Sequence, residues 1–166
     1  MNRAHLQLLF DYHHWAMDHL IKALMQLPAG KLEATSPHLY HETAYKTVRH
    51  VLDVDWSWLR RCQGLPDIGY LWDVVALPDI QSLQHFLHEE ADRTRDYLAG
   101  LSEQGLAATI EFENGQKGPA VWVILNHIVN HGTEHRTELG HFLTELDASP
   151  GELGLFYYVQ AIRNRP

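Results

Sequence analysis

Four long segments of this sequence repeat apolar residues three and four positions apart, and this spacing restricts the chain to helices packed side by side. The first segment runs from about Arg3 to Leu27 and the second from about Glu42 to Gln63. The third begins within "LPDIQSL" and closes at "LAGLSEQG"; the fourth follows "GP" and runs to about Leu146. Pro and Gly mark these ends, as expected where helices stop. We therefore predict an all-α four-helix bundle.

The connections add detail to this bundle. Ile110 and Phe112 followed by Asn114-Gly115 predict a short hairpin or extended loop before the last long helix. The tail "GELGLFYYVQAIRNRP" is compatible with a short extra helix. About fourteen residues join the first two helices, enough for a crossover, so a simple up-down order does not follow. No linker or repeat divides the chain, and we expect one helical bundle domain over residues 1–166.

Charge and composition exclude several classes of function. The formal net charge of −8 argues against a nucleic-acid surface, which needs clustered Lys and Arg. No apolar run approaches the roughly 20 residues of a membrane span, and the N-terminus lacks the apolar core of a signal peptide. Cys62 is the single cysteine, so no internal disulfide can form. We expect a cytoplasmic protein that acts on a small molecule, not on nucleic acid or membrane.

Each long helix carries one polar residue near its middle, within the apolar face. These residues are His13, His50, Glu90 and His131. Polar side chains in such positions need a partner, because burial without one is costly. Mid-helix positions share a level in a bundle, so the four residues are expected to converge on one layer. Side chains from facing helices also build the metal sites of helical bundles.

The stretch "NHIVNHGTEHR" contains the clearest candidate ligands. His131 and His135 are four residues apart and lie one above the other on a helix, where they can bind one ion. His50, flanked by apolar residues, is our choice for the third ligand. Three neutral nitrogens leave a position open for water or substrate, which is the catalytic pattern. The competing interpretation is an exposed stripe of histidines that bind nothing.

Several neighbouring residues have open roles. His13 is expected to be a hydrogen-bonded core histidine, and Glu90 either a metal ligand or the partner of a buried Arg or His. His127 either orients a ligand or stands aside. Glu138 could orient His135, act as a base or simply be solvated. The two histidines of "SPHLYHET" look like loop or surface residues.

With these residues in place, nearly the whole chain resembles the DinB/YfiT-like superfamily. The matching pieces are "LFDYHHWAMDHLIKAL", "VRHVLDVDWSWLRR", "LNHIVNHGTEHR" and the tail "SPGELGLFYYV". The resemblance implies a four-helix bundle, often dimeric, with a divalent metal held by His50, His131 and His135. Members usually follow the last His-Arg with Gly-Gln, whereas here Arg136 precedes Thr137-Glu138.

Characterised relatives in this superfamily include thiol-dependent isomerases and transferases. The resemblance thus implies a metal-dependent enzyme that activates a small thiol or water, with Zn or Ni as the expected metal and a low-molecular-weight thiol as a possible cofactor. The alternatives are a metal-dependent hydrolase and a non-catalytic, metal-stabilised homodimeric interaction protein. A further alternative is a pH sensor whose histidines bind nothing.

Overall fold

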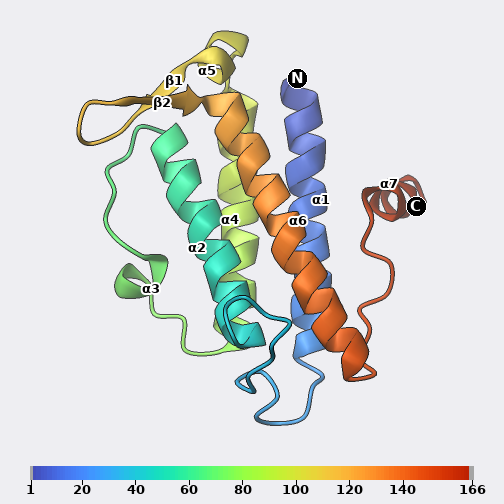
Figure 1. The fold of residues 1–166 in the computed structure, drawn as a ribbon. Coiled ribbons are helices and arrows are strands. Elements are labelled where there is room, and N and C mark those ends of the chain that lie inside the picture. Colours follow the sequence, from blue (N-terminus) through green and yellow to red (C-terminus); the bar gives the residue numbers. More distant parts are fainter. Residues whose placement is uncertain (1, 165–166) are drawn as a thin grey trace.

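The computed structural model describes residues 2–164, and four long helices form its body (Figure 1). These are α1 (Arg3–Leu24), α2 (Ala44–Cys62), α4 (Ile80–Gly100) and α6 (Val121–Glu145). The shorter elements are α3 (Leu71–Val74), α5 (Glu103–Ala107), α7 (Leu155–Arg163) and the strands β1 (Thr109–Glu111) and β2 (Lys117–Ala120). The predicted all-α bundle is confirmed, as are the hairpin and the short C-terminal helix.

The helices begin where side chains can bind free backbone amides. Asn2 accepts a hydrogen bond from the amide of His5, and Thr43 accepts one from Lys46. At the start of α4, Asp79 and Ser82 bind each other's backbone amides in a capping box. Helix α6 has no such cap, because it follows directly on β2. Pro119 lies in strand β2, and α6 begins at Val121, shortly after the "GP" pair that we expected to precede it.

The order of the bundle includes a crossover. Helices α1 and α2 each pack against both α4 and α6, so the first two long helices occupy opposite corners. Figure 1 shows α1 and α6 running in one direction and α2 and α4 in the other. The long connection from residue 25 to 43 makes this arrangement possible. Antiparallel α2 and α6 are therefore neighbours, which brings "TVRH" next to "NHGTEH".

Two apolar clusters fill the bundle, one above the other. The first gathers the C-terminal half of α1 with the start of α4 and the end of α6, and the second gathers the opposite ends of the same helices. Buried polar residues lie between the clusters along the chain, namely His13, His14, Asp55, Glu90, Thr94, His135 and Arg136. Of the four residues expected to converge, His13 and Glu90 belong to this buried set, whereas His50 and His131 are half-buried and pair with each other between α2 and α6. Among the described residues, no helix is long and apolar enough to cross a membrane.

Candidate metal centre

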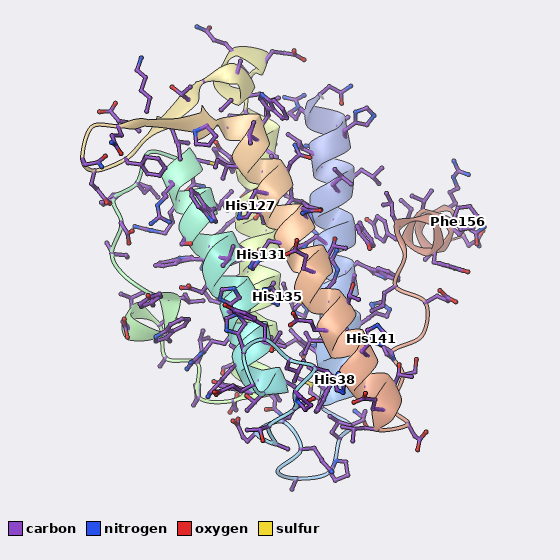
Figure 2. The ribbon with its side chains drawn as sticks, in the orientation of Figure 1. His38, His127, His131, His135, His141 and Phe156 are labelled. Atoms are coloured by element: carbon purple, nitrogen blue, oxygen red, sulfur yellow. The ribbon has the colours of Figure 1, made fainter. Side chains whose placement is uncertain are left out.

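A cluster of imidazoles lies between α2 and α6. Figure 2 shows His127, His131 and His135 following one another along α6. Across from them, the Nε2 atom of His50 lies 3.0 Å from Nε2 of His131, which in turn lies 3.2 Å from Nε2 of His135. The structure thus brings together the three side chains that the sequence singled out.

A fourth imidazole reaches this cluster from the loop before α2. The ring of His41 stacks on that of His50 with centroids 3.8 Å apart, and lies 5.3 Å from that of His135. One ligating nitrogen from each of His41, His50 and His135 lies within 4.8 Å of the others. We had expected His41 to be an ordinary loop residue. Its approach depends on the path of the loop, which no local spacing reveals.

Glu138 orients the cluster from one turn further along α6. Its Oε2 atom accepts a hydrogen bond from Nδ1 of His135 at 3.1 Å. The neutral ring then carries its proton on Nδ1, and the lone pair of Nε2 points at His131. The same carboxylate oxygen accepts the amide of Tyr40 at 3.4 Å, which ties the loop that carries His41 to α6. Glu138 therefore has the orienting contact that was one of our three expectations for it.

Burial keeps these imidazoles neutral. Burial, followed by the charges of the neighbouring histidines, lowers the pKa of His50 to about 4. Burial also lowers the pKa of His131 to about 4, followed by the effects of His135 and His127. Burial is likewise the main cause that lowers the pKa of His41. Near pH 7 the rings therefore offer lone pairs, the form that binds metal ions.

The distances suit a shared ion. Two nitrogens that bind one zinc ion at about 2.0–2.1 Å lie roughly 3.0–3.4 Å apart. The separations of 3.0 and 3.2 Å fall in this range. Among the described residues, Nδ1 of His131 and Nε2 of His41 are buried without a hydrogen-bond partner. Such crowding of lone pairs is costly unless a cation or a proton joins them.

His127 stands apart from the cluster. Its side chain is exposed, with its ring edge toward Trp58 at a centroid distance of 5.9 Å. The ring centroid of His131 is 5.8 Å away, but His131 is half-buried whereas His127 is exposed to solvent. Of the three histidines in "NHIVNHGTEHR", the first is therefore the bystander.

A second polar group, in the core, has a different character. Nε2 of His13 lies 2.7 Å from Oδ2 of Asp55, and Nδ1 of His13 accepts a hydrogen bond from Arg136. Both ring nitrogens are occupied, so His13 is the hydrogen-bonded core histidine that we expected. His14 lies near enough to complete a possible metal-binding group with them. The buried guanidinium of Arg136 would repel a cation there, and we assign this group a structural role.

Glu90 pairs with an arginine and not with the imidazoles of the cluster. Its carboxylate pairs with Arg93, three residues further along α4. Burial raises the pKa of Glu90, whereas the Arg93 contact lowers it. Of our two expectations, the ion pair is the one seen, although Arg93 is half exposed and not buried. Asp55 and Arg136, which complete the polar layer, were not predicted. The only signal for Asp55 was a carboxylate placed between the apolar residues Val54 and Trp56.

The fold and the cluster define a helical bundle protein with a candidate metal centre between two antiparallel helices. The family model described as "DinB family" matches residues 1–162, and the chain belongs to that family. Protein DinB of Bacillus subtilis (strain 168) is 24% identical over 172 aligned residues, covering 91% of this chain and 92% of its own. Uncharacterized protein YizA of the same organism is 29% identical over 119 residues, covering 66% and 68%.

Proposed function

We propose that His50, His131 and His135 bind one divalent transition metal ion, with Zn²⁺ or Ni²⁺ as the first candidates. The observation that supports this proposal is the convergence of three Nε2 atoms, one of them on a ring that Glu138 orients. A carboxylate behind a histidine is the usual support of a metal-binding imidazole. Three histidines alone suit several metals, so the identity of the ion is left to measurement.

We further propose that the protein is an enzyme that uses this site to activate a small thiol or a water molecule. A metal ion there would supply Lewis-acid chemistry, lowering the pKa of a thiol or water at an open position. The chain's own contribution is to keep the imidazoles neutral and to hold His135 in one tautomer. A cleft beside His41 and His50 gives a small molecule access. Thiol transfer is the first reaction class and hydrolysis the second.

A non-catalytic role is the second candidate. In it, the ion joins α2 to α6 and the protein acts as a homodimeric interaction module. The exposed aromatic side chains of α7, Phe156 at 67% and Tyr157 at 44%, are compatible with a partner surface (Figure 2). Under either function, a single domain over residues 1–166 and a cytoplasmic location remain our expectations.

Elemental analysis of protein purified without a histidine tag tests the site. We expect about one equivalent of metal per chain in the wild type and a nearly complete loss in His50→Ala and His131→Ala. His141→Ala is the matched control, because His141 is an exposed histidine on the same helix (Figure 2). Wild-type protein that holds less than about 0.2 equivalents after incubation with Zn²⁺ or Ni²⁺ would contradict the proposal.

Substitution of the orienting carboxylate gives a finer test. Glu138→Gln weakens the hold on His135, so metal affinity should fall by roughly ten- to hundredfold in a chelator competition assay. Glu134→Gln is the control, an exposed glutamate on the same helix. Equal affinities of the two variants would show that Glu138 has no part in the site.

The catalytic and structural roles separate in one comparison. We would measure the melting temperature and the binding of 2-mercaptoethanol for wild type and His131→Ala loaded with Co²⁺, whose visible absorption reports sulfur ligation. Thiol-dependent spectral change in the wild type supports the enzyme. A large loss of stability in the variant, with no thiol response in the wild type, supports the structural role.

A further inference from the structure

The cleft beside the histidine cluster has a volume of about 610 Å³. Two of its walls come from segments on either side of α2, the loop before it and the segment that leads into α3. Its lining is aromatic and basic in addition to the imidazoles of His41 and His50, and includes Tyr40, Lys46, Arg49, Tyr70 and Trp72. This size suits a small organic molecule.

Arg49 holds a fixed position in this cleft. Its guanidinium carbon lies 4.5 Å from the ring centroid of Trp72, and the ring of Trp72 stacks on that of Tyr70 at 4.7 Å and 6°. The three groups form a continuous stack, which immobilises the guanidinium plane without using its hydrogen-bond donors. Arg49 precedes His50 directly, so the stack stands beside the candidate metal centre.

Arg49 makes no direct ion pair, although its charge acts on the carboxylate of Asp53 one helical turn further on. Among the described residues, no carboxylate lies within ion-pair distance of its guanidinium, and its Nε atom is buried without a hydrogen-bond partner. In a chain with a formal net charge of −8, acidic side chains are abundant. Other described arginines of the chain also lack an ion pair, but Arg49 lines a cleft and its buried Nε has no hydrogen-bond partner, so its donors are available to a ligand.

Two carboxylates in the surroundings of Arg49, one on the same helix and one in the cleft lining, already have other partners. Asp53, one helical turn after Arg49, would be the natural ion-pair partner on a helix. It instead accepts the amide of Leu71 at 2.6 Å and holds α3 in place. Glu42, on the rim of the cleft, pairs with Lys46 at 2.6 Å. Because Glu42 and Lys46 pair with each other, Arg49 is the cationic side chain of the cleft lining that no carboxylate contacts.

We propose that Arg49 binds the carboxylate of a small substrate or cofactor whose reactive group faces the histidine cluster. A guanidinium plane held by stacking presents parallel N–H donors that match the two oxygens of a carboxylate. The aromatic walls would cover the apolar part of such a molecule. The position of the reactive group rests on the proposed function, whereas the binding of the carboxylate at Arg49 does not require the metal.

Succinate is a suitable probe, with the neutral succinamide as its matched comparison. We would titrate ¹⁵N-labelled protein, both stripped of metal with a chelator and loaded with Zn²⁺, and follow by NMR the Nε–H resonance of Arg49 in the wild type and the backbone amide resonances of the cleft residues in every variant. We expect saturable shifts with succinate in both forms and none with succinamide. In Arg49→Gln the dissociation constant for succinate should rise by about tenfold or more. Arg49→Lys should be intermediate, because it keeps the charge but loses the parallel N–H donors of the guanidinium.

Arg60→Gln is the matched control on the same helix. Arg60 also stacks on a tryptophan, with its guanidinium carbon 5.0 Å from the ring centroid of Trp56, but it does not line the cleft. Its replacement should leave succinate binding unchanged.

Three results would overturn the proposal. They are absence of succinate binding in both forms, equal binding by wild type and Arg49→Gln, and Arg49-dependent binding of inorganic phosphate in preference to succinate. Metal content, measured separately, identifies a failure of the metal site. Succinate bound in the stripped protein supports the Arg49 site even where no metal binds. Succinate bound only in the zinc form, and equally by Arg49→Gln, locates the anion on the metal.

Discussion

At the scale of single residues, the glycine of the described chain with the least space for a side chain is Gly132, which lies against His13. A Cβ atom added to Gly132 would lie 2.2 Å from Cε1 and 2.5 Å from Nδ1 of the His13 ring. The ring cannot move aside, because it is fully buried and held by Asp55 and Arg136. The glycine after His131 is therefore what lets α1 approach α6 beside the candidate metal centre.

Gly132→Ala should destabilise the protein in spite of the better helix propensity of alanine. Overpacking of this kind costs about 1–3 kcal/mol, against a propensity gain of up to about 1 kcal/mol. Gly140→Ala, on the same helix with no atom within 4 Å of the added Cβ, should leave stability unchanged or raise it. Urea unfolding of both variants measures the difference, and a Gly132→Ala variant as stable as Gly140→Ala would refute the argument.

The candidate ligands could be predicted from sequence to the extent that helical spacing determines them. His131 and His135 share a helix face because they are four residues apart, and His50 is polar within an apolar segment. His41 could not be found in this way, because its position depends on a loop that crosses the bundle and is tied to Glu138. Asp55 and Arg136 likewise become a network only when three helices meet around His13. The metal-binding role of His50, His131 and His135 stays a prediction.

At the scale of elements, α3 is attached by one buried hydrogen bond. This helix of four residues, Leu71–Val74, is too short to be stable by itself. Its fully buried residue Leu71 donates its amide to Oδ1 of Asp53, and the pKa of Asp53 is raised because its carboxylate is buried. The same helix carries Trp72, which holds Arg49, so the cleft depends on this attachment.

Asp53→Ala should loosen α3 selectively. The amide of Leu71 would lose its acceptor, at a cost of about 1–3 kcal/mol, and should exchange with deuterium faster than in the wild type. Asp53→Asn keeps an oxygen in the same position and should restore most of the protection. Equal exchange rates at Leu71 in both variants and the wild type would show that other contacts hold the helix.

Sequence reasoning recovered the elements better than their connections. Apolar periodicity and the flanking Pro and Gly residues located all four long helices within a few residues. The start of α6 after "GP" was predicted, but the strand that contains Pro119 was not, because proline is equally acceptable in a strand and in a first helical turn. The pairing of helices could not be predicted, since amphipathic faces specify that a helix is buried but not which helix covers it.

At the scale of the whole molecule, the polar layer makes stability depend on pH. His14 is buried, and burial, followed by the charge of His13, lowers its pKa well below the ordinary value of 6.5. The unfolded chain takes up a proton near pH 6.5 that the folded protein does not accept. Unfolding is therefore favoured progressively as the pH falls below 6.5, and the stability contributed by neutral His14 is complete only above that value.

His14→Phe should flatten this dependence. The variant has no proton to take up at this position, so its stability relative to the wild type should increase on acidification, by up to about 1.4 kcal/mol for each pH unit below 6.5. Urea unfolding of metal-free protein between pH 7.5 and 4.5 gives both curves. Parallel curves would mean that His14 titrates normally in the folded state.

The contact between His50 and His131 spans 81 residues of sequence. An ion bound there would act as a reversible cross-link between the first third of the chain and its last long helix. A chain with one cysteine has no internal disulfide to close a loop of this length, and long closed loops remove the most entropy from the unfolded state. Cellular metal supply would then set the lifetime of the folded protein. A chelator would destabilise it by removing the cross-link, as a reductant destabilises a secreted domain by breaking its disulfides.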